Sequence, residues 1–517
     1  MGEATMNSKV VCFSNITSDN NFDSSNEAAL CFGHFNSIHP GHIRYFQYAA
    51  LHGAQLIVAL EGDSQMPLAV RDQVFCELDR AESLAALDIV DQVIIMDNGS
   101  LQDLVKLLQP GALVLGKEFE SYSPPRLARA VDQARDQGID VVYAAGETRY
   151  SSTDLLHGTQ SELELDRWQK FQKILTDHHI DLDALLTKLE NLSKSHVLVL
   201  GDTIVDQYVA CDPVGMSNEA PVVVVKELET RDYIGGAAIV AAHVAGLGAR
   251  CSYLSVTGAD DYGEMVKTQL SEMGVEPILF EDSSRPTTFK IRYLVENQKL
   301  FRVSRLKEHP LAKDIEDRVL NSILELSPSL DAIVLSDFVY GMITPNLLKL
   351  LEDLAKKREL LLFGDLQCSS QIGNISKFQK FKLLCPTERE ARIALGNQHD
   401  GVEYIANLLI ESTESKNLIL KLGAEGFIAY DKELNPDFLH RQYFPALAVN
   451  PVDVAGAGDS LLATVSMGMS RGLTLMEAAA LGCCASAIAV QTVGNIPIQL
   501  SQIRNFVEYR GLVSNEV

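Results

Sequence analysis

The chain has 517 residues, of which 46% are hydrophobic and 22% are charged, a composition typical of globular proteins rather than disordered ones. This length exceeds one ordinary core and predicts about two to four domains. The formal net charge of −25, from 44 Lys and Arg against 69 Asp and Glu, argues against a nucleic-acid partner, because phosphate backbones are bound by basic surfaces.

The nine cysteines include no C-x-x-C pair, and their number is odd. This pattern disfavours a disulfide framework or a zinc ribbon and favours the reducing cytoplasm as the location. The first 26 residues lack the apolar core of a secretory signal. The longest stretch of low polarity, residues 478–490, is shorter than the roughly 18 residues of a membrane span, so it predicts a buried helix and no membrane partner.

Residues 1–26, which are rich in Ser, Asn and Asp, predict a poorly ordered tail. After it, short apolar runs alternate with stretches of helical periodicity. Continuous apolar runs separated by helices predict parallel strands covered on both faces, and we expect a first α/β domain over residues 27–158. The runs are Leu56–Leu60, Val93–Met96, Leu113–Leu115 and Val141–Tyr143.

In this first domain, His39 and His42 stand three residues apart beside Pro40-Gly41, at a predicted strand-to-helix turn. Two imidazoles and the free amides of a helix N-terminus can hold a triphosphate while its α-phosphate is attacked. Residues 28–158 resemble the cytidylyltransferase-like nucleotidyltransferases. The resemblance implies catalytic roles for His39 and His42. It implies nucleotide contacts for Phe35, Ser152 and Thr153, although a helix N-cap explains the last two almost equally well.

Residues 159–194 are highly charged and helical in pattern, which predicts a helical connector. A new apolar strand, Val197–Leu200, then opens a second α/β unit over residues 195–517. Within it, residues 221–226 and 290–295 have β-type composition without intervening helices and predict a small antiparallel flap. We therefore expect an α/β protein with two Rossmann-like, doubly wound parallel-sheet domains, the second carrying a flap.

The segment from Asp453 to Ser460 crowds small residues before an Ala- and Leu-rich helix. Small residues let the backbone approach a ligand, and a helix N-terminus offers free N–H groups and a positive dipole end. We expect Gly456, Ala457 and Gly458 to stabilise a transferring phosphoryl group, and Asp459 to take a proton from the attacking hydroxyl. A glycine-rich turn with an Asp N-cap is the structural alternative.

The whole span 195–517 resembles the ribokinase-like family of sugar kinases, whose anion hole and catalytic Asp fall at the Gly-Ala-Gly-Asp segment. The resemblance implies ATP as co-substrate and Mg²⁺ as cofactor. It places the sugar hinge at Gly235 and Gly236, the nucleotide loop at Gly423 and Gly426, and a nucleotide contact and magnesium ligand at Glu390.

Three further passages, residues 201–208, 217–222 and 287–302, resemble the heptose-phosphate kinase branch of that family. Carboxylates such as Asp202 and Asp206, four residues apart after a strand, suit vicinal sugar hydroxyls. Cations suit a substrate's own phosphate, and a solvated flap face is the alternative for each one alone. The predicted phosphate contacts are Lys290, Arg292 and Arg302. Four departures from the family pattern leave the substrate open: Ile239, Tyr340, Gln367 and Thr387.

The two halves together resemble the fused enzyme of ADP-heptose synthesis, with the domain order reversed. The resemblance implies phosphorylation of a heptose 7-phosphate-like sugar at C1, followed by nucleotidyl transfer to the sugar 1-phosphate, and it leaves ATP or CTP open at the second step. The expected partners are a sugar phosphate and a nucleotide, and flaps of this kind often pair into homodimers. The alternatives are a different sugar or nucleoside kinase with an inactive nucleotidyltransferase domain, and a nucleotide-binding regulatory protein without activity.

Overall fold

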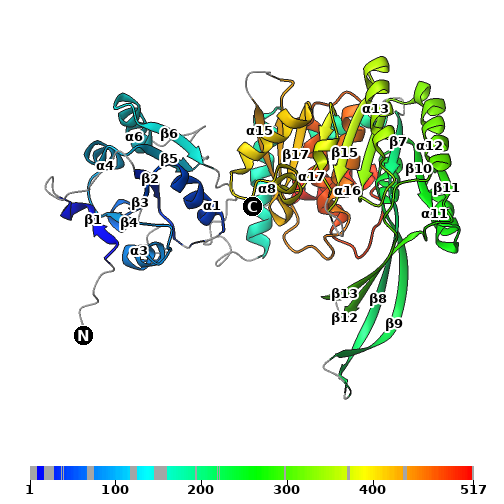
Figure 1. Ribbon diagram of the computed structural model, residues 1–517, viewed down its shortest axis with the longest axis horizontal. Coiled ribbons are helices and arrows are strands. Elements are labelled where there is room, and N and C mark those ends of the chain that lie inside the picture. Colours follow the sequence, from blue (N-terminus) through cyan, green and yellow to red (C-terminus); the bar gives the residue numbers. More distant parts are fainter. Residues whose placement is uncertain are drawn as a thin grey trace. The chain divides into compact units, whose positions relative to one another are not determined.

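The computed structural model describes residues 8–16, 28–36, 38, 40–66, 75–116, 125–144, 160–191, 195–217, 219, 222–295, 298–368, 373–434 and 439–514. The chain divides into two compact units, residues 1–158 with 397–405 and residues 159–396 with 406–517. Each unit has its own sheet and its own core (Figure 1). We propose residues 158–159 as the boundary between the domains.

The first unit contains a parallel six-stranded sheet in the order β1-β4-β3-β2-β5-β6. Alternate residues of its strands face opposite sides: Ala29 and Cys31 lie in one core with Phe46, whereas Ala28 and Leu30 lie in another with Leu104. Helices therefore cover both faces, as predicted. The elements are β1 (Val10–Cys12), η1 (Phe13–Asn15), β2 (Ala28–Gly33), α1 (Pro40–Ala49), η3 (Ala50–His52), β3 (Gln55–Glu61), η4 (Asp63–Gln65), α3 (Glu77–Ala85), β4 (Gln92–Met96), α4 (Leu101–Leu108), β5 (Ala112–Gly116), α6 (Pro125–Asp136) and β6 (Asp140–Ala144).

Strand β1 lies inside the segment that the sequence predicts to be a tail, and that prediction is wrong for residues 8–16. Val10 is buried and pairs with Val93 of β4. The ammonium of Lys9 donates hydrogen bonds to the carbonyl oxygens of Leu87, at 3.2 Å, and Val90, at 2.8 Å. The apolar run Val10–Phe13 is short and lies in a segment rich in Ser, Asn and Asp, so the composition of that segment hides the strand.

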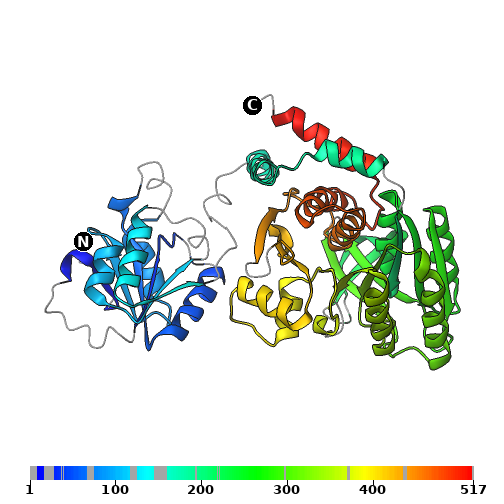
Figure 2. The same cartoon turned by 90° about the horizontal axis from the view of Figure 1, so that it is seen from above.

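The second unit contains a nine-stranded sheet in the order β11-β10-β7-β14-β15-β16-β17-β18-β19, parallel from β11 to β17 and antiparallel at β18 and β19. Helices lie on both faces of this sheet (Figure 2). Its strands and short helices are β7 (His196–Gly201), β10 (Arg250–Thr257), β11 (Val275–Glu281), η5 (Ser327–Ser329), β14 (Ala332–Asp337), β15 (Leu361–Leu366), η6 (Ile375–Lys377), β16 (Leu383–Leu384), β17 (Asn417–Lys421), η7 (Gly423–Glu425), β18 (Gly426–Asp431) and β19 (His440–Pro445). Its α-helices are α8 (Gln160–Asp177), α9 (Leu182–Asn191), α10 (Ala237–Gly246), α11 (Asp261–Glu272), α12 (Lys313–Leu326), α13 (Pro345–Arg358), α14 (Glu388–Leu395), α15 (Val402–Thr413), α16 (Ala457–Ser470), α17 (Leu475–Ala489) and α18 (Leu500–Ser514).

A four-stranded flap in the order β13-β12-β8-β9 extends away from the main sheet of this unit (Figure 1). The strands are β8 (Thr203–Met216), β9 (Val223–Gly236), β12 (Thr288–Val295) and β13 (Gln298–Arg305). The predicted flap is therefore present, but β12 pairs with β8 in parallel, not antiparallel. This pairing aligns Asp206 with Lys290, and the antiparallel β8–β9 pair aligns Asp206 with Tyr233.

The predicted connector is helical, and its helices α8 and α9 belong to the second unit. Trp168, Phe171 and Leu186 are buried in the same core as α10, α16 and α17. Figure 2 shows α9 alongside the C-terminal helix α18. Helix α17 is almost wholly buried, as residues 478–490 predict. Within the described residues, none of the helices combines the length and the apolar content needed to cross a bilayer.

Candidate active site

The centre of the candidate site is the N-terminus of α16. Gly456 precedes the helix with φ +83°, a left-handed conformation that favours glycine, and an added Cβ would lie 3.1 Å from the side-chain oxygen of Asn495. The first N–H groups of a helix have no partner within the helix. Here they belong to small residues on the wall of a cavity, so the backbone can approach a ligand closely.

Asp459 is the third residue of α16 and is only 8% exposed. The side-chain amide of Gln367 donates a 2.7 Å hydrogen bond to its Oδ1 atom. Burial raises the pKa of Asp459 to about 7, and the nearby charge of Asp365 adds to this rise, whereas Lys421 and the Gln367 hydrogen bond oppose it. A carboxylate with a pKa near neutrality is suited to general-base chemistry.

Lys421 and Asp365 form a buried ion pair beside this helix end, with 2.6 Å between Nζ and Oδ2. Burial alone would lower the pKa of Lys421, but Asp365 and Glu390 raise it above its usual value, so the side chain stays an ammonium ion. Burial raises the pKa of Asp365 to about 6. An added Cβ on Gly458 would lie 3.2 Å from the Lys421 nitrogen, which places a fixed cation next to the free amides. Sequence reasoning missed both members of this pair.

Glu390 lies on the wall of the same cavity. It forms a capping box with Thr387 at the start of α14, and its Oε1 atom accepts a 2.9 Å hydrogen bond from the backbone of Cys368. Each carboxylate oxygen retains further lone pairs, so the residue still fits a magnesium ion carried by nucleotide phosphates. Among the described residues there is no cluster of three or more His, Cys, Asp or Glu side chains that would hold a metal without such a ligand.

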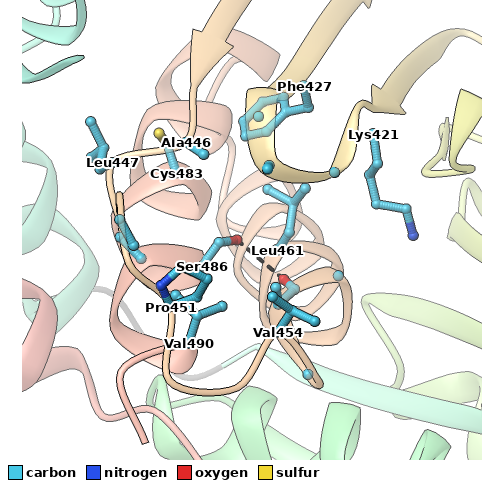
Figure 3. Close-up of a pocket in the computed structure, with 18 of the residues that line it drawn as sticks. Lys421, Phe427, Ala446, Leu447, Pro451, Val454, Leu461, Cys483, Ser486 and Val490 are labelled. Atoms are coloured by element: carbon cyan, nitrogen blue, oxygen red, sulfur yellow. Dashed lines mark hydrogen bonds between the residues drawn. The ribbon is translucent and has the colours of Figure 1, made fainter. Parts of the chain in front are cut away.

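A cavity of about 530 Å³ joins these groups to the predicted nucleotide loop. Figure 3 shows Lys421 on one side of the cavity and Leu447 and Cys483 on the other. Gly423 and Gly426 lie on its wall. Gly426 has φ +111°, and an added Cβ would meet the carbonyl oxygen of Phe444 at 2.1 Å, so only glycine fits there. The structure thus gathers the predicted loop, helix end and carboxylates around one space.

On the flap side, Asp206 forms an ion pair with Arg292 and accepts a 3.0 Å hydrogen bond from the side chain of Asn495. An added Cβ on Gly235 would lie 2.4 Å from the Asp206 carboxylate, so this glycine makes room for the acidic group. The charge of Asp206 is also among the causes that raise the pKa of Asp459. The two carboxylates are therefore close enough for their charges to interact.

The carboxylate of Asp202, which the sequence groups with Asp206 as a group suited to sugar hydroxyls, has different partners from Asp206. Its two oxygens accept backbone N–H groups of Phe338, Tyr340 and Met342 at 2.9 to 3.3 Å. Burial and the charge of Asp337 raise its pKa to about 6. Asp202 fixes the loop after β14, and the structure does not support its predicted contact with sugar hydroxyls. Gly236, the second hinge glycine, packs beside it with φ +61°.

The three predicted phosphate contacts have different surroundings. Lys290 is buried, and its ammonium lies 5.1 Å and 5.4 Å from the ring centres of Phe338 and Tyr340, which suits cation–π attraction. Arg292 is engaged with Asp206, and its guanidinium lies over Tyr208. Arg302 is exposed on β13, directly opposite Arg292.

Asp453 connects the loop before α16 to the flap. Its carboxylate accepts a 2.7 Å hydrogen bond from the Tyr208 hydroxyl, and it forms a 2.7 Å ion pair with Lys299 of β13. It also accepts the backbone N–H of Ala455 at 3.0 Å. The position of the flap is thereby linked to the loop that carries Gly456.

In the first unit, His42 lies on α1, whereas His39, Ser152 and Thr153 lie outside the described residues. The side chain of Phe35 is 4% exposed and packs against the rings of His42 and Phe46, and its nucleotide contact stays a prediction. Its ring belongs to the core of the first unit. Arg80 is buried; it pairs with Asp63 at 2.7 Å and donates a hydrogen bond to the carbonyl oxygen of His34.

Comparisons with known proteins agree with this fold. The profile of the pfkB family carbohydrate kinases matches residues 194–501, and that of the cytidylyltransferase-like family matches residues 30–158. The first match covers more than half of the chain, which therefore belongs to the pfkB family of carbohydrate kinases and also carries a cytidylyltransferase-like domain.

The chain is similar to the bifunctional protein HldE of Pelobacter propionicus, with 28% identity over 332 residues, and of Trichlorobacter lovleyi, with 30% identity over 328 residues. Each match covers 63% of this chain, and 66% and 65% of the respective relative, so the chain spans just under two thirds of their length. A crystal structure of phosphofructokinase-2 from Escherichia coli has the same fold, with a TM-score of 0.51 and 17% identity over 61% of this chain and 99% of that chain.

Proposed function

We propose that the second unit is an ATP-dependent kinase that phosphorylates a hydroxyl of a sugar phosphate, with Asp459 as the general base. The observation that carries this proposal is the placement of a buried carboxylate, with a pKa of about 7, beside the free amides of α16 and on the wall of the nucleotide cavity. A base, an anion-stabilising helix end and a nucleotide-sized space are the parts that phosphoryl transfer needs.

In the proposed reaction, ATP lies in the cavity with its phosphates toward Lys421 and the amides of residues 456–458. Asp459 accepts the proton of the attacking hydroxyl, and the bond from this oxygen to the γ-phosphorus forms as the bond to the β-phosphate oxygen breaks. Lys421 and the helix end stabilise the charge that develops. Magnesium, when bound to the phosphates next to Glu390, would neutralise part of that charge.

For the acceptor we propose a heptose 7-phosphate-like sugar, phosphorylated at C1. Asp206 and Asn495 offer hydrogen-bonding groups for hydroxyls, and Lys290, Arg292 and Arg302 bring positive charge to the flap. The similarity to bifunctional HldE proteins supports this choice of substrate class. A different sugar or nucleoside kinase is the second candidate, because Asp202 and Arg292 are already engaged with protein groups.

For the first unit we propose nucleotidyl transfer to the resulting sugar 1-phosphate, giving an ADP-sugar such as an ADP-heptose and releasing pyrophosphate. His39 and His42 would hold the triphosphate, with Ser152 and Thr153 at the phosphates. We also propose that the protein acts in the cytoplasm and forms a homodimer through its flap. The flap exposes several large apolar side chains: Val214, Met216, Val223 and Leu228.

A substrate screen with ATP and Mg²⁺, with ADP and pyrophosphate release read separately, tests these proposals. We expect ADP release with phosphorylated sugars, and pyrophosphate release only once a sugar 1-phosphate is present. ADP release without pyrophosphate would leave the kinase proposal standing and reject the transferase. Nucleotide binding without release of either product would favour a regulatory protein.

The kinase rate should depend on pH in the direction set by Asp459. A general base works in its ionised form, and burial raises its pKa to about 7. We therefore expect kcat to fall about tenfold for each pH unit below about 6, and to level off above about 8. Rates measured with a saturating sugar phosphate between about pH 5 and about pH 9 would check this, and a flat profile would contradict it.

Arg292→Ala should weaken binding of the phosphorylated acceptor. The substitution removes a cation from the flap and leaves the buried Asp206 carboxylate without its ion-pair partner, so we expect KM for the sugar phosphate to rise about 10- to 100-fold with a smaller change in kcat. Arg231→Ala is the matched control, because Arg231 is an exposed flap arginine that forms an ion pair with the exposed Glu229. An unchanged KM, together with a preference for sugars without phosphate, would favour the second candidate.

A further inference from the structure

Helix α8 contributes a residue to the nucleotide cavity from outside the span that matches the kinase family. Arg167 lies on the wall of the cavity, whereas the family match begins at residue 194. Its Nη1 atom donates hydrogen bonds to two backbone carbonyl oxygens, those of Ala446 at 2.8 Å and Ala448 at 3.1 Å. The position of Arg167 therefore depends on a helix that ordinary members of the family need not have.

The packing of α8 fixes this arginine in place. Its neighbour Trp168 is 5% exposed, and Phe171, one turn further on, is fully buried in the core. The ring of Trp168 packs edge-on against Phe506 of α18, with 6.2 Å between the ring centres. Arg167 is thus held between a well-packed helix and the segment that follows β19.

That segment lines the apolar end of the cavity. Leu447, Cys483 and Val490 lie on this side, away from Lys421 (Figure 3). The ammonium group of Lys421, which suits phosphates, lies on the opposite side of the cavity. An apolar wall with a few fixed polar groups is the usual surrounding of a nucleotide base.

Arg167 has donors left for a ligand at this end. Its two hydrogen bonds both come from Nη1, and within the part of the chain that the structure describes, Nε and Nη2 have no hydrogen-bond partner. The planar guanidinium can also stack on an aromatic ring. A purine offers both a flat face and ring-nitrogen acceptors.

We propose that Arg167 contacts the purine base of the nucleoside triphosphate, so that α8 contributes a ligand-binding residue to the kinase site. This proposal rests on the proposed kinase function and deepens it, because it assigns base recognition to a residue outside the family's domain. The region that the sequence marks as a connector then carries part of the nucleotide affinity.

The test is calorimetric titration of the full chain with ADP and, separately, with inorganic tripolyphosphate, each with Mg²⁺. Arg167→Ala should raise Kd for ADP about tenfold and leave Kd for tripolyphosphate unchanged, because the latter has no base. Arg167→Lys keeps a donor for the loop carbonyls but loses the planar fork, so an intermediate Kd for ADP is expected. Lys170→Ala, which removes an exposed cation of the same helix paired with Asp166, should bind ADP like the wild type.

Equal ADP affinity in Arg167→Ala and the wild type would overturn the proposal. Equal weakening toward ADP and tripolyphosphate would also overturn it, since the arginine would then act only through the folding of the cavity wall. A different result would contradict the kinase proposal: if the wild-type protein bound neither ADP nor tripolyphosphate, the cavity would not be a nucleotide site.

Discussion

Asp459→Asn should lower kcat by about 100- to 10,000-fold while the protein still binds ADP. The amide cannot accept the proton of the attacking hydroxyl, but it has nearly the same shape as the carboxylate. Its oxygen can still accept the hydrogen bond from Gln367. The measurement is kcat for sugar-dependent ADP release at pH 8, with ADP affinity determined in parallel by titration.

Asp459→Asn should not lower the free energy of unfolding at pH 8, whereas a folding defect would lower it. Because the folded-state pKa of Asp459 is raised to about 7, its stabilising contribution is present at low pH and is lost as the pH rises through that value. Asparagine does not ionise and so carries no buried charge at pH 8. The variant should therefore be at least as stable as the wild type at that pH. Ser460→Ala, in the same turn, is the control and should keep kcat within about threefold. A kcat within tenfold of the wild type in Asp459→Asn would rule out the catalytic role.

Lys421→Met should be the most destabilising single change near the site. It leaves Asp365, whose side chain is fully buried, without its partner, and breaking a buried ion pair in this way costs about 3–5 kcal/mol. The loss should be largest above pH 7. Lys421 lowers the pKa of Asp365, so in the variant this pKa should lie above about 6. The loss should therefore shrink as the pH falls toward about 6, because the carboxylate binds a proton and no longer carries an uncompensated charge. Denaturant unfolding at pH 5 and pH 8 would measure both values.

The double variant Asp365→Asn/Lys421→Met separates the contribution of the ion pair to stability from the role of Lys421 in phosphoryl transfer. Removing both charges should recover most of the lost stability at pH 8, yet kcat should stay low because the cation beside Gly458 is absent. If the double variant were as unstable as Lys421→Met alone, the unpaired carboxylate would not be the cause of the instability. If it regained full activity, Lys421 would have no part in phosphoryl transfer.

The features that follow from short stretches of sequence were predictable. The runs at Val197–Leu200 and Leu113–Leu115 are buried parallel strands, because a continuous apolar run fits only a sheet covered on both faces. The helix end at residues 456–459 is contiguous in the sequence, so its glycines and carboxylate were visible as one pattern. The helical character of residues 159–194 followed from their charge pattern, but their burial against the second unit did not.

The features that depend on distant residues were not predictable. Lys421 is the last residue of β17, and Gln367 follows β15. Both line the cavity because the ends of parallel strands share one edge of the sheet. Asp202 was assigned to the sugar because it lies four residues from Asp206. Its carboxylate instead accepts a hydrogen bond from the backbone of Phe338, more than 130 residues away in the sequence. The resemblance assigns Phe35 to the nucleotide, and the burial of its side chain in the core was not visible in the sequence.

The most direct test of the proposed chemistry is a crystal structure of the full chain with ADP, aluminium fluoride and the sugar phosphate that supports the fastest ADP release. We predict the fluoride group against the amides of residues 456–458, with a carboxylate oxygen of Asp459 about 2.6–3.2 Å from the acceptor hydroxyl. A nucleotide bound elsewhere, or an Asp459 side chain turned away from the hydroxyl, would contradict the kinase mechanism.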